Sequence, residues 1–329
     1  MRKRWALALA ISMSCTREPG HGRALDAPRP EVDAPTDTGE DVCAEVPVLP
    51  EGEWRHTGSS LLAAVGDPHH RGRDLVAATT DATQVFDGKL TYGPTDKDLQ
   101  DEDVDVYACF DDTWRSLGTA RTDDDGRFTL TLTGERRLPA GLRDLYLSVV
   151  GDRTGARALA LVAPAAQRVL VSDIDGTLTE SENEYPVALA TGTDTDVHPH
   201  AAEAFRDAAA KGIVPIYISA RGDRFTQDTR DWLAANGFPR GPIHLPRSIV
   251  TIPGEDTIAF KTAALDLVEP FELVAGIGNR ATDVAAYKDA GLPPGRILIK
   301  LDEFAEELAA DLAAGRATGF PSYDQLPAL

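Results

Sequence analysis

Two aspartates, Asp173 and Asp175, stand one residue apart at the end of an apolar run in RVLVSDIDGTLTESEN, residues 168–183. Two like charges at the end of a buried strand repel each other, so something must compensate them. A hard divalent cation such as Mg²⁺ prefers carboxylate and carbonyl oxygens. We therefore expect Asp173 and Asp175 to take part in a Mg²⁺ site.

The same pair has the residue types that phosphoryl transfer needs. Asp173 could remain ionised beside the metal and attack phosphorus as a nucleophile, forming an aspartyl-phosphate. Asp175 could give a proton to the leaving oxygen and later take one from water. Gly176 lets the chain turn sharply, and Thr177 offers a hydroxyl and a backbone N–H to a phosphate group.

Further candidates follow later in the chain. Ser219, Ala220 and Arg221 come directly after the apolar run GIVPIYI, where the Ser219 hydroxyl could hydrogen-bond a phosphate oxygen. Lys261, in TIAFKTAAL, could neutralise charge on the nucleophile and on the transferring phosphoryl group. A serine before a helix can simply be its N-cap. The hypothesis of a phosphate site therefore rests on the order of all the motifs along the chain.

A second acidic motif, AGIGNRATD, contains Asn279 and Asp283 four residues apart. Both could contact a metal from the turn that opens a helix. The spacing leaves open which of the two is the direct ligand.

The elements that must position these residues alternate between strand and helix from residue 164 onward. The expected strands are 168–174, 213–219, 243–246, 272–278 and 296–301, and the expected helices are 200–211, 223–236, 258–268, 281–290 and 302–314. Strands joined by helical crossovers form a parallel sheet that is covered on both faces. In such doubly wound α/β sheets, ligands bind beyond the carboxyl ends of the strands, where the candidate residues lie.

The preceding segment has a different pattern, with short β-rich runs between turn residues over about 84–163. Phe128, Leu130 and Leu132 alternate with threonines, as a half-buried strand requires. The turn TDDDGRF favours an Asp-Gly hairpin over a calcium loop, because it lacks the spacing of an EF-hand. We expect a small antiparallel β-sandwich, which with its N-terminal extension forms a domain over 53–163, followed by an α/β domain over 164–329.

The N-terminal residues differ from both domains. MRKRWALALAISMSC, residues 1–15, has the basic start, short apolar stretch and small residues before Cys15 that are typical of a bacterial lipoprotein signal. Residues 16–52 are rich in proline and acids and predict a disordered linker. We expect an exported protein, lipid-anchored at a bacterial membrane, or a cytoplasmic one if the signal is spurious. Whether Cys43 and Cys109 pair stays open.

The formal charge of −20 disfavours a general affinity for nucleic acid or anionic lipid. The α/β segment alone has 14 basic and 25 acidic residues. Several arginines near the second and third expected strands could form a local basic rim, or could pair with Asp223, Asp228 and Asp231; they are Arg221, Arg224, Arg230, Arg240 and Arg247.

The order DxDGT, strand-ending serine, lysine and GNxxxD resembles that of the haloacid dehalogenase (HAD) superfamily of phosphotransferases. Over roughly 168–300 the motifs SDIDGTLTESE, YISARGDRFTQDTRDWL and GIGNRATDVAAYKDAGLP are similar to the phosphatidate phosphatase domain of lipins. They are also similar to the related C-terminal domain of membrane-associated phosphatidylinositol transfer proteins. This resemblance implies a HAD-like Rossmannoid fold, with Asp173 as nucleophile and Asp175 as acid/base. It also implies Mg²⁺ between Asp173, the Asp175 carbonyl and the turn at 279–283.

Only about 44 residues separate Asp175 from Ser219, which leaves space for a flap but not for a cap domain. An open site suits a bulky phosphate monoester, so we expect hydrolysis of phosphatidate to diacylglycerol by a protein that is peripheral to, or anchored at, a membrane. Two alternatives stay open: a non-catalytic phosphatidate sensor, and a soluble phosphatase for another monoester. The presence of both aspartates favours catalysis.

Overall fold

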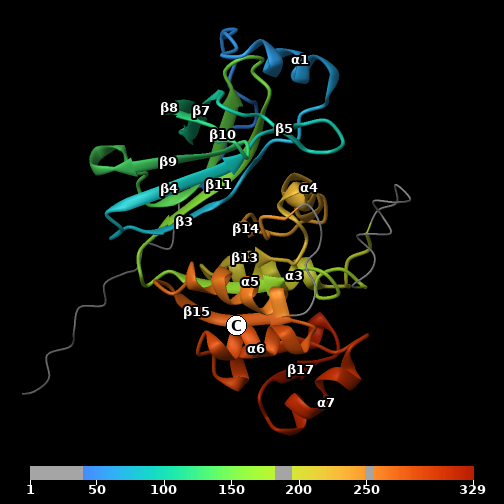
Figure 1. Ribbon diagram of the computed structural model, residues 1–329. Helices are drawn as coiled ribbons and strands as arrows, with labels where there is room; N and C mark the ends of the chain where they lie inside the picture. The colour runs from blue at the N-terminus through green and yellow to red at the C-terminus, as the bar shows by residue number, and fades with distance from the viewer. Residues whose placement is uncertain (1–39, 182–194, 249–254) are drawn as a thin grey trace, which may run out of the picture. The chain divides into compact units, whose positions relative to one another are not determined.

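Figure 1 shows a computed structural model of the chain, which describes residues 40–181, 195–248 and 255–329. The expected signal at 1–15, residues 16–39 of the expected linker and most of the expected flap lie outside the described residues. In the part of the chain that is described, no helix is long and apolar enough to cross a membrane.

Two β-sheets form the first part of the described chain (Figure 1). One has the strand order β3-β11-β10-β7-β8 with β1 beside β10, and its strands are β1 (Glu40–Asp41), β3 (Leu75–Ala78), β7 (Asp103–Phe110), β8 (Thr113–Arg121), β10 (Gly141–Val149) and β11 (Gly155–Ala163). The other has the order β2-β4-β9, with β2 (Arg71–Gly72), β4 (Thr83–Lys89) and β9 (Arg127–Thr133). Smaller elements are α1 (Thr57–Val65), the ribbon of β5 (Thr91–Tyr92) and β6 (Lys97–Asp98), and the 3₁₀ turn η1 (Gly134–Arg136).

The β-sandwich differs from the expected one in two respects. It is not wholly antiparallel, because β1 pairs in parallel with β10 and β3 pairs in parallel with β11. The Asp-Gly turn at 122–126 is not a hairpin either, because β8 pairs with β7 while β9 pairs with β4 in the other sheet. The turn itself forms as expected: the Asp123 carboxylate accepts hydrogen bonds from the N–H groups of Asp125 and Arg127, and Gly126 has φ +67°.

Side-chain alternation explains how the sandwich is buried. In β9, Phe128, Leu130 and Leu132 point into the sandwich core, as the sequence predicts. In β11 the residues of one parity, such as Ala160, pack in that core, and those of the other parity, such as Leu161, pack against the α/β domain. Both faces of β11 are therefore covered, which is why its sequence is a continuous apolar run.

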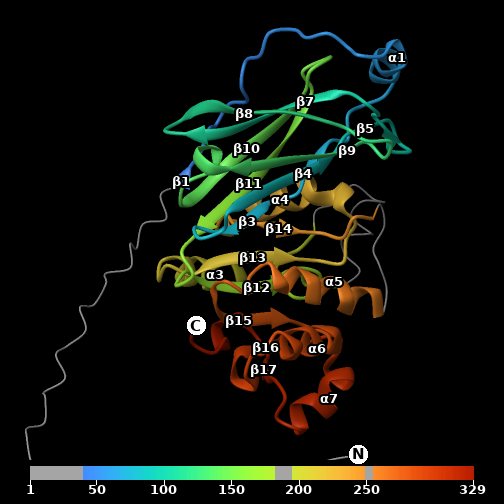
Figure 2. The same cartoon turned by 60° about the vertical axis from the view of Figure 1, so that its left-hand side comes forward.

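The second part of the chain contains one parallel sheet with the order β14-β13-β12-β15-β16-β17, which can be followed in Figure 2. Its strands are β12 (Arg168–Asp173), β13 (Val214–Ile218), β14 (Ile243–His244), β15 (Glu272–Gly278), β16 (Ile297–Lys300) and β17 (Thr318–Phe320). The direction of strand succession reverses between β12 and β15, and such a switch point opens a crevice at the carboxyl ends. The strand β17 was not expected, because its three residues include a glycine and carry no periodic signal.

Helices cover both faces of this sheet. They are α3 (Ala201–Ala209), α4 (Thr226–Ala235), α5 (Glu255–Asp266), α6 (Ala281–Asp289) and α7 (Ala305–Ala313), with 3₁₀ turns η2 (Asp223–Phe225), η3 (Pro294–Arg296) and η4 (Tyr323–Gln325). Leu170 of β12 packs in one core with α3 and α4, whereas Val169 and Val171 pack in the other with α5 and α6. The domain limit predicted at 163/164 stays a prediction; it falls between β11 and β12.

Ion pairs connect the sandwich to the α/β domain, and they replace the basic rim considered from the sequence. Arg230 of α4 pairs with Asp74 at 2.7 Å, and Arg247 pairs with Asp87 at 2.8 Å. Likewise, Arg224 pairs with Asp96, and Arg240 pairs with Glu40 and Asp144. These acidic partners come from the sandwich and its N-terminal strand, so they are distant from the arginines along the chain.

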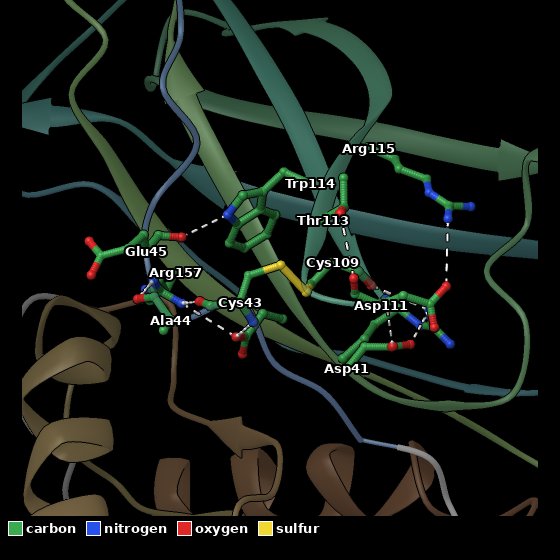
Figure 3. The surroundings of a disulfide bond; sticks show 12 residues. Asp41, Cys43, Ala44, Glu45, Cys109, Asp111, Thr113, Trp114, Arg115 and Arg157 are labelled. Carbon is green, nitrogen blue, oxygen red and sulfur yellow. Dashed lines mark hydrogen bonds and ion pairs between the residues drawn. A yellow bond between two sulfur atoms is a disulfide. The ribbon is translucent and has the colours of Figure 1, made fainter.

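The pair Cys43 and Cys109 forms a disulfide (Figure 3). The surrounding backbone is also held, because Arg157 donates to the carbonyl oxygen of Cys43 at 2.7 Å and Trp114 Nε1 donates to that of Glu45 at 2.8 Å. The segment from β1 to Glu45 thus packs on β7, β8 and β11, although the sequence predicts it to be part of a disordered linker. Its composition does not reveal this, because the disulfide and the ion pairs of Glu40 and Asp41 join it to residues far along the chain.

Candidate active site

The crossover order of the sheet brings the sequence motifs to one edge. Asp173 is the last residue of β12, Ser219 follows β13, and Asn279 follows β15. Because β13 and β15 are the two neighbours of β12, these three strand ends are adjacent. Lys261 reaches the same place from α5, and Asp283 reaches it from the first turn of α6.

One buried ammonium group holds two of the acids. Lys261 Nζ lies 3.1 Å from Asp173 Oδ1 and 2.5 Å from Asp283 Oδ1, and all three side chains are at most 5 % exposed. Burial opposes the charge of Lys261, but the carboxylates of Asp173 and Asp283 outweigh it and raise the pKa of the ammonium group. The expected meeting of Asp173 with the 279–283 turn is therefore present.

Asp283 also fixes the start of α6. Its Oδ2 accepts hydrogen bonds from the backbone N–H groups of Asn279 at 3.1 Å and Arg280 at 3.0 Å. With Oδ1 on Lys261, both carboxylate oxygens of Asp283 have partners inside the protein. In this arrangement Asp283 positions the turn, and Asn279, 2 % exposed, is the residue that the turn carries to the end of β15.

Asp175 has a separate set of partners. Arg221 donates to it from Nε at 3.0 and 2.9 Å and from Nη2 at 2.7 Å, and Ser219 Oγ donates at 2.6 Å. Arg221 is 2 % exposed and also contacts Thr229 Oγ1 at 3.3 Å. The serine and arginine of the SAR motif thus contact Asp175, a partner that the sequence analysis did not consider for either residue.

The turn after β12 leaves one hydroxyl available. Gly176 has φ +65°, a conformation that suits glycine, and its N–H donates to Thr179 Oγ1. Thr177 is fully buried, and its hydroxyl has no hydrogen-bonding partner among the residues that the structure describes. Ala220 is half-buried beside Ser219. Thr177 is therefore available for the expected phosphate contact.

Two residues at this turn could not be found from the sequence. Tyr323 of η4 donates its hydroxyl to the Thr177 carbonyl oxygen at 2.8 Å. His198 donates its backbone N–H to the carbonyl oxygen of Leu178 at 2.9 Å. Both come from distant parts of the chain and belong to no motif, so only the tertiary structure brings them to the site.

The donor types fit a hard cation. Three acids, Asp173, Asp175 and Asp283, face two cationic side chains, Lys261 and Arg221, which leaves a net negative charge in a buried site. Carboxylate and amide oxygens are the ligands that Mg²⁺ prefers. In the structure these acids contact Lys261 and Arg221. Among the described residues, no group of three His, Cys, Asp or Glu side chains is arranged to hold a metal ion.

The fold and the site define a class of protein: a β-sandwich followed by an α/β domain whose parallel sheet gathers acids at its switch point. Residues 170–300 match the family model described as "PITM 1-3, LNS2 domain", and residues 68–162 match "PITM 1-3, beta-sandwich domain". Both parts are thus similar to domains of one protein family. The finer likeness to lipins stays a prediction.

Curated relatives agree with these two matches. Membrane-associated phosphatidylinositol transfer protein 3 of Mus musculus is 29 % identical over 266 residues, which cover 80 % of this chain and 26 % of that protein. Protein retinal degeneration B of Drosophila melanogaster is 29 % identical over 290 residues, covering 83 % and 22 %. The chain therefore spans about a quarter of the length of the relatives it matches.

Solved structures are more distant. The D,D-heptose 1.7-bisphosphate phosphatase from B. bronchiseptica, complexed with magnesium and phosphate, shares 12 % identity at a TM-score of 0.36 and covers 48 % of this chain and 94 % of its own. A putative beta-phosphoglucomutase from Thermotoga maritima shares 14 % at a TM-score of 0.34 and covers 48 % and 95 %.

The predicted location is wrong. The sequence predicts an exported, lipid-anchored bacterial protein, whereas the curated relatives are membrane-associated phosphatidylinositol transfer proteins of mouse, human and rat and the fly protein. A short basic and apolar start followed by a cysteine also arises by chance, and its residues 1–15 lie outside the described part of the chain.

Proposed function

We propose that this protein is a Mg²⁺-dependent phosphatase that hydrolyses a phosphate monoester through an aspartyl-phosphate. The observation that carries the proposal is the buried cluster at the end of β12, where Lys261 lies between Asp173 and Asp283 while Asp175 lies beside Ser219 and Arg221. A buried carboxylate that contacts a lysine and lies near a second acid is suited to attack phosphorus.

The reaction takes place in two steps. A carboxylate oxygen of Asp173 forms a bond to phosphorus, the ester P–O bond breaks, and Asp175 gives its proton to the leaving alcohol oxygen. A water molecule then attacks phosphorus, Asp175 takes a proton from that water, and the acyl phosphate P–O bond breaks. Phosphate leaves and Asp173 is regenerated as a carboxylate.

Substrate binding must rearrange the contacts of Asp175. Its carboxylate accepts hydrogen bonds from Arg221 and Ser219. A bound phosphate group would compete for the same donors, so that Arg221 and Ser219 turn to its oxygens and release Asp175, which then takes up from solvent the proton that it gives to the leaving oxygen. Thr177 would add its unused hydroxyl.

Mg²⁺ would be held by Asp173, the Asp175 carbonyl oxygen and Asn279 at the turn that Asp283 fixes. When bound, it would supply positive charge to the phosphoryl oxygens. Lys261 adds a second positive charge, 3.1 Å from Asp173.

For the substrate we propose phosphatidate, which would be hydrolysed to diacylglycerol. The support is that the matched relatives are named as phosphatidylinositol transfer proteins and as membrane-associated. Because these relatives are named as membrane-associated, we also propose that the protein contacts a membrane peripherally.

A second function, binding of phosphatidate without hydrolysis, is favoured by one observation. Asp175 is fully engaged by a bidentate arginine and a serine, and both oxygens of Asp283 are engaged as well. If these contacts persist when the ligand is bound, the site holds a phosphate group and lacks an acid to protonate the leaving oxygen.

The test is phosphate release from phosphatidate in mixed micelles with Mg²⁺, with and without EDTA. We expect release that stops with EDTA and in Asp173→Asn, and that continues in the control Asp207→Asn, which removes an exposed acid of α3. Binding of phosphatidate without any release would establish the sensor instead. Faster release from a soluble monoester would exclude phosphatidate as substrate and leave the two-step reaction intact.

A further inference from the structure

A groove lies between the β2-β4-β9 sheet of the sandwich and the end of β14, and it is rich in cations. The groove is open to solvent on one side. Its basic side chains are Arg71, Arg73, Lys89, Arg127 and Arg247. In a chain of formal charge −20, such a local excess of positive charge is unusual.

The carboxylates in the groove are too few for its guanidinium groups. Asp87 lies 2.8 Å from Arg247 but 4.0 Å from Arg73. Asp223 lies 2.8 Å from Arg71 but 3.9 Å from Arg127. Each acid thus has one close arginine and one that stands at the limit of an ion pair.

Arg73 and Arg127 are the two cations left over. Within the described residues, neither guanidinium group donates a hydrogen bond, and their side chains are 32 % and 25 % exposed. Arg71 and Lys89 differ, since Arg71 also pairs with Asp96 at 3.0 Å and Lys89 pairs with Asp98 at 2.8 Å. Arg73 and Arg127 therefore have only long ion pairs, at 4.0 and 3.9 Å, whereas the other cations of the groove have short ones.

Electrostatics at Arg73 agree with this account. Burial lowers its pKa, and the neighbouring guanidinium groups of Arg247 and Arg127 lower it further against the opposing effect of Asp87. An anion placed between these arginines would relieve their mutual repulsion. A phosphate group suits the place because planar guanidinium groups bind its oxygens bidentately.

The groove opens at the same edge of the sheet as the candidate active site. Asp223 lies four residues after Ser219, and its backbone N–H donates to the carbonyl oxygen of Pro246, next to Arg247. The strand β14 is two positions from β12 in the sheet, which corresponds to about 10 Å. A group bound in the groove would be a near neighbour of a group bound at Asp173.

We propose that this groove is a second phosphate-binding site, formed jointly by the sandwich and the α/β domain, for the phosphate of an anionic lipid headgroup or for free phosphate. Binding there does not depend on hydrolysis at Asp173. The site gives the β-sandwich a role of its own, because Arg73 and Arg127 both belong to it.

The test uses the full chain carrying Asp173→Asn, so that no substrate is consumed. The double variant Arg73→Gln/Arg127→Gln is compared with Arg115→Gln/Arg316→Gln, which removes the same charge from exposed arginines that do not line the groove. Sedimentation with phosphatidylcholine vesicles, with and without phosphatidate, measures the lipid arm. Calorimetric titration with inorganic phosphate measures the free-anion arm. Arg247→Gln, at a half-exposed position, is a second variant should the double variant fold poorly.

If the groove binds lipid phosphate, the Arg73/Arg127 variant loses about tenfold in affinity for phosphatidate vesicles and the control loses less than about twofold. If it binds free phosphate, the titration loses one of two sites in the Arg73/Arg127 variant only. Equal behaviour of both double variants in both arms would overturn the proposal. Failure of phosphatase activity in the protein with an intact Asp173 would leave it standing.

Discussion

At the scale of single residues, the site depends on one buried lysine that contacts two of its acids. Lys261 contacts both Asp173 and Asp283. Its position between them places a positive charge beside the proposed nucleophile and holds the turn that carries Asn279. A lysine has a compact charge that can contact both carboxylates at once, which the planar group of an arginine would do less well.

We predict that Lys261→Gln lowers the free energy of unfolding by about 3–5 kcal/mol, because it leaves two buried carboxylates without their cation. Urea unfolding measures the loss. Lys288→Gln, which removes the same charge from the exposed side of α6, is the control and should change little. If the acids form a metal site, MgCl₂ should stabilise Lys261→Gln more than the control. Equal stability of the two variants would mean that another group neutralises the acids.

At the scale of elements, the junction of β15 with α6 is packed too closely for any side chain larger than hydrogen at Gly278. A Cβ built at Gly278 would lie 2.4 Å from Asp283 Cγ and 2.5 Å from its Cβ and Oδ2. The glycine thus allows Asp283 to fold back over the strand end and accept the N–H groups of Asn279 and Arg280. Strand, turn and helix are joined through this one carboxylate.

Gly278→Ala should therefore displace Asp283. We expect the variant to remain folded but to release phosphate more slowly than the parent protein. We expect a loss of about 1–3 kcal/mol in the free energy of unfolding, the usual cost of forcing atoms into a packed site. Gly295→Ala is the matched control, because a Cβ there meets nothing within 4 Å. Full activity in Gly278→Ala would show that the position of Asp283 does not matter to the reaction.

At the scale of the whole molecule, the sandwich and the α/β domain share buried polar groups. The Asp74 carboxylate accepts from Arg230 of α4, from the Leu159 N–H of β11 at 2.7 Å and from the Ile243 N–H of β14 at 2.7 Å. Its side chain is fully buried. One acid in the loop before β3 thus joins three elements, and the two parts are expected to unfold together.

The dependence of stability on pH follows from two buried histidines, one in each part. Burial lowers the pKa of His70 and of His244 from 6.5 to about 4. Between these values the unfolded chain binds protons that the folded protein does not, so the free energy of unfolding falls as the pH drops from 6.5 towards 4. The expected loss is about 3 kcal/mol per histidine. Urea unfolding at several pH values should show that the free energy of unfolding depends less steeply on pH in His244→Phe and in His70→Phe than in the parent protein. An unchanged dependence on pH would contradict this assignment.

Local patterns in the sequence were sufficient for most elements of the α/β domain. The expected strand 168–174 is Arg168–Asp173 and the expected helix 281–290 is Ala281–Asp289, because apolar runs and helical periodicity are short-range signals. The edge strand β8 carries no comparable signal, since its residues are mostly exposed and do not alternate regularly. The positions of the candidate residues at strand ends could likewise be predicted, because each of these residues follows an apolar run.

By itself, the sequence determined the types of the chemical groups, their order along the chain and the strands whose ends carry them. Only the tertiary structure decided their partners: Arg221 on Asp175, Lys261 between two acids, and the sandwich aspartates on the arginines of the α/β domain. The physical reason is the separation along the chain over which each kind of interaction acts. Propensity and periodicity act over a few residues, whereas an ion pair depends on which charges the packed sheets bring within a few ångströms, at any distance along the chain.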